Sequence, residues 1–298
     1  MTLGTTTRLA TAFGLLAASA VYARAPDVYT FCAHFQNPAD ASSAAASQPL
    51  PRAHAHNDYH HPRPLLDALD HGFCSVEADI FLVGDQLLVG HSPIELRPAR
   101  TLQALYLDPL RRRVQDNGGR VYRDGPPFTL LVDVKTDAER TYAVLATALA
   151  GYADMLTSVR DGGLEPRAVN VIISGNRAEQ TVANAPLRYV GIDGRLGDLD
   201  TPRPSHLVPL ISDSWRSHFR WLGQGPMPEP ERKKLRGIVD QAHATGRRVR
   251  FWATPDDPAV WRELADAGVD LLNADDLAGL ERFLRSRNPP ARAPDYGE

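Results

Sequence analysis

The chain has 298 residues, of which 43% are hydrophobic and 23% are charged, and its formal net charge is −3. A chain of this length can bury a large core, and α/β barrels reach it as single domains. The near-neutral charge and the scattered Lys and Arg residues give no basic surface for nucleic acid, so no nucleic-acid partner is expected.

The first 25 residues have the pattern of a secretory signal peptide. Arg8 supplies a positive charge, residues 9–21 (LATAFGLLAASAV) form a short apolar core, and the tripeptide ARA at 23–25 is a small-x-small cleavage site. The apolar run is short for a bilayer span, although an uncleaved membrane anchor is the alternative. The sequence therefore predicts a secreted or periplasmic protein.

The remaining chain divides into three parts. Residues 26–50 are predicted to be a flexible linker, because 38–50 (PADASSAAASQPL) is rich in Ala and Ser and has no period. Residues 51–287 are predicted to form the folded domain. The Pro-rich segment 288–298 is predicted to be a disordered tail.

The chain contains two cysteines, Cys32 and Cys74. Export would permit a disulfide. However, Cys74 precedes a predicted core strand, where a lone Cys packs as a small apolar residue. We expect free thiols, and neither cysteine has the spacing of a metal site.

From residue 51 onward, strand-like and helix-like segments alternate. The predicted strands are 51–56, 73–80, 128–134, 168–174, 188–193, 207–212, 248–253 and 269–273. The predicted helices are 62–70, 137–153, 176–184, 229–245, 257–267 and 275–285. Continuous apolar runs such as VNVII and LLVDV are typical of parallel strands buried on both faces. Eight strands with mostly helical crossovers predict an α/β fold of the (β/α)8 TIM-barrel type. A doubly wound open sheet is the alternative, but no Gly-rich phosphate loop follows the first strand.

Two longer segments, 94–127 and 213–228, interrupt this alternation. Long loops at the C-terminal rim of a barrel usually cover its site. Trp215, Phe219 and Trp221 in the second segment could grip a lipid, but packing on the barrel is the expected role.

Two of the predicted strands carry carboxylates that share a strand face with another polar residue. Strand side chains alternate, so Glu77 and Asp79 of SVEADI share one face, and Asp133 and Lys135 of LLVDVK do the same. Buried carboxylates are costly when unpaired, and a divalent cation removes that cost. Oxygen ligation without cysteine favours Mg²⁺ or Ca²⁺. Alternatively, Glu77 and Asp79 are only the polar face of an edge strand.

Two histidines flank these acids in the sequence. His56 stands in AHNDY, and His91 ends LLVGH. One imidazole can take a proton while the other gives one, as phosphodiester cleavage requires. The other three histidines of AHAHNDYHH are expected to be loop or supporting residues. Asp58 either orients His56 by a hydrogen bond or caps the helix that follows.

The residues that carry chemistry fall at or near the C-terminal ends of the predicted strands. They are His56, Glu77, Asp79, Asp133, Lys135, Ser174, Asp193, Ser212, Trp252 and Asn273. In barrel enzymes this rim hosts the active site. Ser212 and Asp193 are equally compatible with a structural role.

The segments AHNDYHHPRPLLDAL, GFCSVEADIFL and LLVGH resemble the PLC-like phosphodiesterase superfamily. That superfamily includes glycerophosphodiester phosphodiesterases, phosphatidylinositol-specific phospholipases C and the sphingomyelinase D group. The likeness is closest to the altered inheritance of mitochondria protein 6 branch and runs from about residue 51 to 285. LLVDVKT is similar to a sphingomyelinase D segment, and FWATPDD and ADAGVDLLNADD are similar to the last two strands of the superfamily.

The resemblance implies two catalytic histidines and one divalent cation. His56 would be the base or nucleophile, and His91 would be the acid that protonates the leaving oxygen. The ligands of one Mg²⁺ or Ca²⁺ ion would be Glu77, Asp79 and Asp133.

The resemblance also implies substrate contacts. Lys135 would contact the phosphate, Trp252 would form a wall of the pocket, and Asn273 is a weaker match on the last strand. The sequence departs from the pattern of the superfamily at Asn57, where glycerophosphodiester phosphodiesterases usually carry Arg. The departure weakens the case for a glycerophosphodiester substrate, and no match to the phosphatidylinositol-binding arginines is seen.

The sequence therefore predicts a metal-dependent phosphoric diester hydrolase. Its substrate would be a small-molecule or lipid phosphodiester, such as a phospholipid or glycerophosphodiester, with transient membrane-surface contact, and a monomer is expected. One rival is an amidohydrolase-type metal barrel, because His54 and His56 of the first strand form an H-x-H pair. The other is a secreted barrel without catalysis, which the complete set of acids and histidines argues against.

Overall fold

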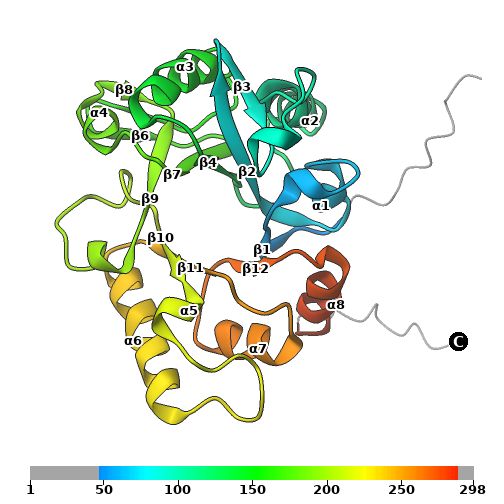
Figure 1. Cartoon of the computed structure of the whole chain (residues 1–298), viewed down its shortest axis with the longest axis vertical. Helices are drawn as coiled ribbons and strands as arrows, with labels where there is room; N and C mark the ends of the chain where they lie inside the picture. The colour runs from blue at the N-terminus through cyan, green and yellow to red at the C-terminus, as the bar shows by residue number, and fades with distance from the viewer. Residues whose placement is uncertain (1–46, 288–298) are drawn as a thin grey trace, which may run out of the picture. The chain divides into compact units, whose positions relative to one another are not determined.

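The structure, a computed structural model, describes residues 47–287 (Figure 1). The predicted signal peptide, most of the predicted linker, Cys32 and the predicted tail lie outside these residues, so those predictions stay untested. Within the described part the first strand begins at Leu50, at the end of the predicted linker.

Eight parallel strands form a ring, seen end-on in Figure 1. They are β1 (Leu50–Ala55), β2 (Phe73–Val83), β4 (Phe128–Val134), β7 (Val169–Gly175), β9 (Val190–Gly194), β10 (Leu210–Ser214), β11 (Arg248–Trp252) and β12 (Leu272–Ala274). Their order around the ring is β12-β1-β2-β4-β7-β9-β10-β11. The ring nearly closes, because β11 and β12 meet through a single parallel bridge between Arg250 and Leu271. The predicted (β/α)8 barrel is confirmed.

Helices follow most of the strands and surround the ring (Figure 1). They are α1 (Leu66–Asp70), α3 (Ala138–Ala150), α4 (Glu179–Asn184), α6 (Glu229–Ala244), α7 (Pro258–Asp266) and α8 (Leu277–Arg287). Side-chain caps explain two of the starts: Asp137 accepts a hydrogen bond from the Arg140 amide at 2.9 Å, and Asp257 accepts one from the Ala259 amide at 2.6 Å. Each helix lies where the sequence predicts one, with ends shifted by a few residues.

Several short elements were not predicted. β2 turns back into β3 (Gln86–Val89) as an antiparallel hairpin. Residues 94–127 contain a π-helical turn (Gln103–Leu107) that continues into α2 (Asp108–Asp116). A separate antiparallel sheet has the order β6-β5-β8. Its strands are β5 (Ser158–Arg160), β6 (Gly163–Glu165) and β8 (Leu187–Arg188). Strands of two to four residues are too short to show a period of alternation.

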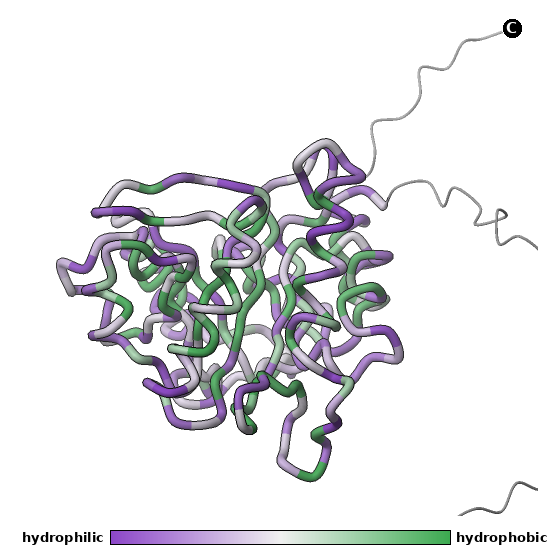
Figure 2. The backbone as a smooth tube through the Cα atoms, turned by 90° about the horizontal axis from the view of Figure 1, so that it is seen from above, coloured by the Kyte–Doolittle hydropathy of each residue, from purple (hydrophilic) through white to green (hydrophobic). Residues whose placement is uncertain are grey.

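The core has two parts. Hydrophobic stretches lie in the middle of the molecule and hydrophilic ones on its outer loops (Figure 2), because the outward faces of the strands pack against the helices. A smaller cluster comes from four different strands or strand ends and consists of Leu131, Ile172, Leu210 and Leu271. The inward-facing residues that follow this layer along the strands are polar, so the apolar layer closes the barrel beneath the candidate site.

The segment 213–228 packs onto the barrel, as expected. It contains the short helix α5 (Trp215–His218). Trp215 and Phe219 stack with their ring centroids 4.0 Å apart, and the Trp215 indole donates a hydrogen bond to the Trp221 carbonyl at 2.7 Å. All three aromatic side chains are buried.

Two further findings bear on the sequence predictions. Cys74 is buried and has no disulfide partner among residues 47–287, while its pairing with Cys32 stays untested. Among residues 47–287 no helix combines the length and the apolar character that crossing a membrane requires.

Candidate active site

Three carboxylates converge at the C-terminal end of β2 and β4. Asp79 and Asp133 are paired in register across the two parallel strands, and Glu77 lies one inward position earlier on β2. One oxygen from each of the three groups lies within 4.8 Å of the other two. The convergence predicted from strand alternation is confirmed.

Two oxygens of this cluster have no hydrogen-bond partner within the described part of the chain. Both are buried, and they are Oδ1 of Asp79 and Oδ1 of Asp133. An unsatisfied buried acceptor costs about 1–3 kcal/mol. Burial raises the pKa of Asp133 to about 6 and also raises the pKa of Asp79, and the neighbouring carboxylates add to both shifts. The cluster therefore has acceptor capacity and excess negative charge, which is the donor set that a hard divalent cation fits.

Gly175 leaves room for one of these oxygens. It ends β7 with φ +66°, and a Cβ at this position would overlap Oδ1 of Asp133 and the Val134 carbonyl. A glycine accepts both this φ and this close approach, whereas other residues do not.

Lys135 is the basic side chain that meets Asp79 and Asp133. Its Nζ lies 3.0 Å from Oδ2 of Asp79 and 3.2 Å from Oδ2 of Asp133. Burial opposes the charged form, but the two carboxylates outweigh it and raise the pKa of Lys135. The ammonium offsets one of the three negative charges, and it lies beside the oxygens that would hold a cation.

Glu77 has a partner that the sequence analysis missed. The Arg250 guanidinium, on β11, which β12 and β1 separate from β2, donates a hydrogen bond to Oε2 of Glu77, and its Nε donates to Oδ1 of Asn273 at 2.8 Å. Burial alone would raise the pKa of Glu77, but Arg250 outweighs it and holds the pKa low. The signal was the alternation of RVRFW, which gives Arg250 the same inward face as Trp252.

His54 is a buried, neutral histidine with a neighbour at each ring nitrogen. Burial and the nearby Arg250 lower the pKa of His54 to about 3, so the ring is neutral. Its Nδ1 lies 2.7 Å from the Ser75 hydroxyl and its Nε2 lies 3.4 Å from Glu77. Both nitrogens are thus engaged by protein groups, whereas the amidohydrolase rival needs a ring nitrogen of His54 that faces the ion.

The β2–β3 hairpin brings His91 to the acids. The Gly90 amide donates to the Asp79 carbonyl at 3.2 Å, so the chain returns to the end of β2. His91 Nδ1 lies 3.3 Å from Oδ2 of Asp79, and its side chain is 56% exposed. The Glu95 carboxylate accepts a hydrogen bond from the His91 amide at 2.9 Å and fixes the turn.

His56 follows β1 on the same rim. Its Nδ1 lies 2.9 Å from Oδ1 of Asp275 and 2.9 Å from the Asn57 side-chain nitrogen. Asp275, just after β12, therefore orients the ring. Asp58 does not, because it is buried and accepts the Leu65 amide at 2.6 Å ahead of α1. Neither of the two roles considered for Asp58 is seen as predicted: Asp58 binds the amide of Leu65, the residue before α1, and α1 has no side-chain cap.

Tyr59 contacts His91 directly and His56 only through Asn57, and sequence reasoning did not single it out. Its hydroxyl lies 2.7 Å from Oδ2 of Asp79, 2.7 Å from Oδ1 of Asn57 and 3.1 Å from Nδ1 of His91. Burial and the adjacent Asp79 raise the pKa of Tyr59, so the phenol stays protonated. A residue three positions after His56 thus joins the surroundings of both histidines.

The remaining predicted site residues have different surroundings. Trp252 ends β11 and is 38% exposed, so it is available at the rim. Asn273 is buried as the partner of Arg250, and nothing here tests its predicted substrate contact. Asp193 accepts hydrogen bonds from Ser174 at 2.7 Å and from Ser212 at 2.6 Å, and it also forms a salt bridge with Arg195 at 2.9 Å.

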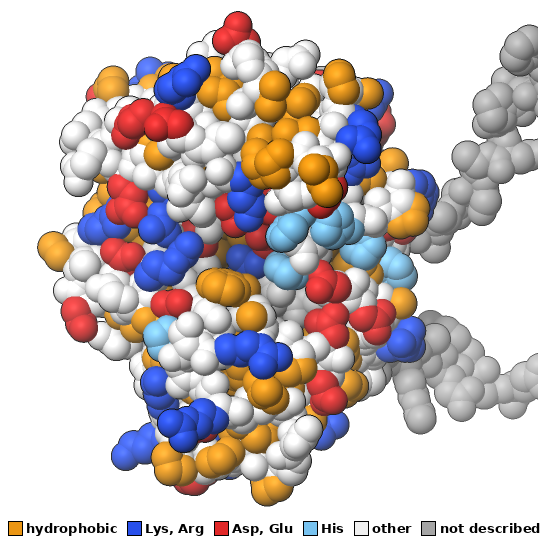
Figure 3. All heavy atoms as spheres, viewed as in Figure 1, with side chains coloured by type: hydrophobic (Ala, Val, Ile, Leu, Met, Phe, Trp, Pro, Cys, Tyr) orange, Lys and Arg blue, Asp and Glu red, His pale blue; other side chains and the backbone are white. Residues whose placement is uncertain are grey.

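The space-filling view shows the site from the rim. Histidine side chains gather beside acidic ones near a hollow at the centre of this face (Figure 3). The cation-fitting oxygens and both predicted catalytic histidines thus belong to one end of the barrel, as the strand-end argument predicted.

Comparison with known proteins assigns this barrel to a family. The family model described as AIM6-like phosphodiesterase domain matches residues 44–193, and the model of the glycerophosphoryl diester phosphodiesterase family matches residues 248–278. The fold and these matches define a barrel of the phosphodiesterase class.

Two curated fungal proteins are similar over most of the chain. Altered inheritance of mitochondria protein 6 of Eremothecium gossypii is 32% identical over 270 residues, covering 78% of this chain and 69% of the fungal protein. Its homologue in Arthroderma benhamiae is 32% identical over 259 residues, covering 77% and 82%. The chain belongs to the AIM6-like phosphodiesterase family.

A solved structure is also similar. It is a glycerophosphodiester phosphodiesterase from Parabacteroides distasonis, with a TM-score of 0.49 and 14% sequence identity, and the match covers 81% of this chain and all of that one.

Proposed function

We propose that this protein is a metal-dependent phosphoric diester hydrolase that works by histidine acid–base catalysis. The observation that carries the proposal is the pair of buried, unpartnered oxygens on Asp79 and Asp133, on the same rim as His56 and His91. A barrel without a reaction would gain nothing from keeping such uncompensated acceptors.

The ion would be held by Asp79 and Asp133, with Glu77 as the third ligand. When bound, a divalent cation neutralises charge on the non-bridging oxygens of a phosphodiester. Lys135 adds a second positive charge close to the same place and would bind a phosphate oxygen. Because Glu77 already receives the Arg250 guanidinium, it would bind the ion through its remaining acceptor capacity.

The two histidines would move protons. Asp275 holds Nδ1 of His56, so Nε2 is the nitrogen that would accept a proton from the attacking hydroxyl group or water. Tyr59 and Asp79 lie at Nδ1 of His91, so its Nε2 would give a proton to the leaving oxygen. His91 is the more exposed of the two, as a group that meets a departing alcohol needs to be.

The substrate would be a small-molecule or lipid phosphodiester. Asn57, where glycerophosphodiester phosphodiesterases usually carry Arg, is already used to contact His56 and Tyr59. Asn57 has no guanidinium to bind the phosphate, and its amide is engaged by these two neighbours. Trp252, exposed at the rim, would pack on the apolar part of the substrate.

The test is a screen of the purified protein against a panel of phosphodiesters, with Mg²⁺, Ca²⁺, Zn²⁺ or a chelator. We expect turnover that the chelator abolishes and one of the ions restores. Asp133→Asn should weaken metal binding, so that extra metal partly restores its activity. Asp85→Asn, on an exposed turn, is the matched control and should behave as the wild type.

Two outcomes would contradict the proposal. Full activity in the presence of chelator would show that no cation takes part in the reaction. No turnover on any diester, with metal bound normally, would favour the non-catalytic barrel.

Export and a monomeric state belong to the proposal as well. Secretion would yield a mature chain that begins at Pro26, and mass spectrometry of the exported protein checks this. Light scattering of the purified protein checks the oligomeric state.

A further inference from the structure

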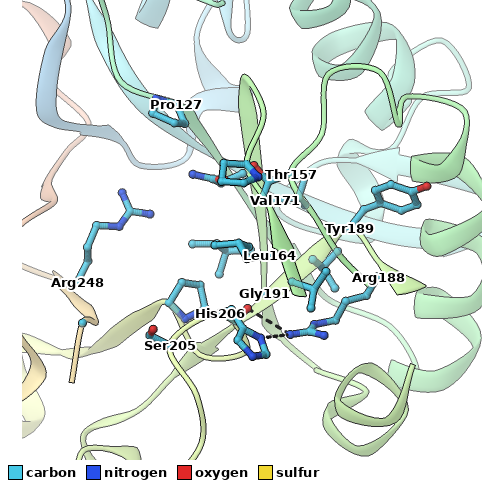
Figure 4. A pocket seen from close by; sticks show the side chains of 17 residues that line it. Pro127, Thr157, Leu164, Val171, Arg188, Tyr189, Gly191, Ser205, His206 and Arg248 are labelled. Atoms are coloured by element: carbon cyan, nitrogen blue, oxygen red, sulfur yellow. Dashed lines mark hydrogen bonds between the residues drawn. The ribbon is translucent and has the colours of Figure 1, made fainter. Parts of the chain in front are cut away.

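A second cavity lies at the opposite end of the barrel from the candidate active site. Its volume is about 370 Å³. Residues at or just before the N-terminal ends of β7, β9, β10 and β11 line it together with residues of β5, β6 and β8 and of the neighbouring loops (Figure 4). The catalytic rim is formed by the C-terminal ends of the same barrel strands, so the two sites do not share side chains. A volume of this size is in the range of small-molecule pockets.

Two arginines line this cavity without an acidic partner. Within residues 47–287 neither Arg188 nor Arg248 forms a salt bridge. Arg248 donates to the Thr129 hydroxyl at 3.1 Å. Arg188 is 4% exposed, donates to Nδ1 of His206 at 2.6 Å, and keeps a buried Nε with no partner in that part of the chain.

A bound anion would offset the desolvation cost of these two guanidinium charges. Burial lowers the pKa of both Arg188 and Arg248, and the nearby Asp270 offsets only part of the shift at Arg248, yet a guanidinium does not lose its proton in a protein. Because His206 accepts a hydrogen bond from Arg188 at Nδ1, its ring is neutral at that nitrogen and does not compensate the charge. An oxyanion would pair with the guanidinium donors in the fork geometry that arginine favours.

Much of the remaining lining is apolar. Val159, Val171, Val190 and Pro209 line the cavity, and so does Leu164 of β6, which is 51% exposed. In Figure 4, Arg248 and Arg188 stand on opposite sides of the view, with Leu164 between them. A large apolar side chain left in solvent beside a cavity is covered at little cost when a ligand packs on it.

We propose that this cavity binds a small organic anion, with its oxyanion group at Arg248, a short apolar body packed on Leu164, and the positive charge of Arg188 on the opposite side. The chemical class is an aliphatic carboxylate or a phosphate monoester. The site is separate from the hydrolytic one and does not depend on its activity.

The experiment measures binding to the full-length protein by isothermal titration calorimetry. The probes are octanoate and octyl phosphate, with 1-octanol as the neutral match and inorganic phosphate as the headgroup alone. We expect saturable binding of at least one octyl anion at a stoichiometry of one, and much weaker binding of octanol. The comparison of the two anions shows which oxyanion is preferred.

Variants locate the site. Arg248→Met should weaken binding of the preferred anion about tenfold to a hundredfold, because a charge-assisted hydrogen bond is lost. Arg236→Met, on the exposed face of α6, is the matched control and should change nothing. Because Arg248→Met could disturb folding, Leu164→Glu and Leu164→Lys form a second, surface-exposed pair. Glu should weaken binding by repulsion, and Lys should not.

Three results would overturn the inference. The first is equal affinity for octanol and the octyl anions. The second is equal affinity for inorganic phosphate and octyl phosphate, which would remove the apolar contact. The third is anion binding that neither Arg248→Met nor Leu164→Glu weakens, which would place it elsewhere, including at the catalytic rim.

Discussion

The Tyr59 hydroxyl lies 2.7 Å from Oδ2 of Asp79, the oxygen that His91 and Lys135 also approach. The phenol is protonated and buried, so it donates a hydrogen bond to the carboxylate and can accept one from Nδ1 of His91. It therefore sets the direction of one carboxylate and one imidazole together.

Tyr59→Phe should lower turnover more than it lowers stability. The ring still fills its place, so the free energy of unfolding should fall by only about 0.5–1.5 kcal/mol. His91 and Asp79 lose a common partner, so kcat should fall about tenfold or more while KM changes little. Steady-state kinetics and thermal unfolding measure the two effects. Tyr122→Phe, which loses hydrogen bonds to the Leu69 and Phe73 carbonyls, is the control and should lose stability alone. Equal kinetic losses in both variants would refute a role at the site.

Arg250→Met should destabilise the protein strongly. It would leave Glu77 buried without its guanidinium and Asn273 without its donor, at a cost of about 3–5 kcal/mol. Divalent metal should recover part of the loss, since it compensates the same carboxylate. Denaturant unfolding with and without Mg²⁺ or Ca²⁺ checks this. An unchanged midpoint in Arg250→Met would show that the pair contributes no net stability.

His91→Ala should lose more activity on poor leaving groups than on good ones. An alkyl alcohol needs a proton as it leaves, whereas nitrophenolate does not. Paired assays on an alkyl diester and a nitrophenyl diester, each in saturating metal, give the ratio of losses. His60→Ala, an exposed neighbour that contacts Glu95, is the control. The same loss on both substrates would exclude His91 as the acid.

Lys135→Met separates a catalytic role from a structural one. If Lys135 binds the phosphate, turnover and substrate affinity should fall, while metal affinity stays normal or rises because a like charge is gone. We expect the turnover loss to dominate. If Lys135 only offsets the carboxylates, the metal-free protein should lose stability and turnover in saturating metal should hardly change. Metal titration, thermal unfolding without metal and kinetics with it decide between the two.

Asp58 should make stability fall as pH rises. Burial raises the pKa of Asp58 to about 7 against its ordinary value of 3.8, despite the hydrogen bond from the Leu65 amide. The native state therefore holds a proton that the unfolded state releases between these two values. Stability from this group is full below the unfolded pKa and is lost as pH rises through the folded one. Asp58→Asn keeps an acceptor for Leu65 and should flatten this slope, so its advantage over the wild type should grow from about pH 4 to about pH 8. Unfolding midpoints across that range test the difference, and parallel curves for the two proteins would contradict it.

The alternation of side chains along the sequence was enough to predict the fold class and the end of the barrel where the site lies. The barrel, the inward direction of Glu77, Asp79 and Asp133, and the location of the site at the strand ends follow from a period of two and from continuous apolar runs. These are local properties, so a single sequence contains them. The helix ends were predicted to within a few residues, since caps such as Asp137 and Asp257 act within one turn.

Only the tertiary structure decided which side chains pair with each other across the barrel. Arg250 and Glu77 are 173 positions apart, and Asp275 and His56 are 219 apart, and no period relates residues across such distances. Nearly closing the ring brings the last strands beside the first and creates both contacts. The same ring closure leaves Arg188 and Arg248 around a cavity at its other end. Their burial and the absence of a salt bridge to either of them within the described residues, which no local pattern predicts, make this cavity a candidate anion site.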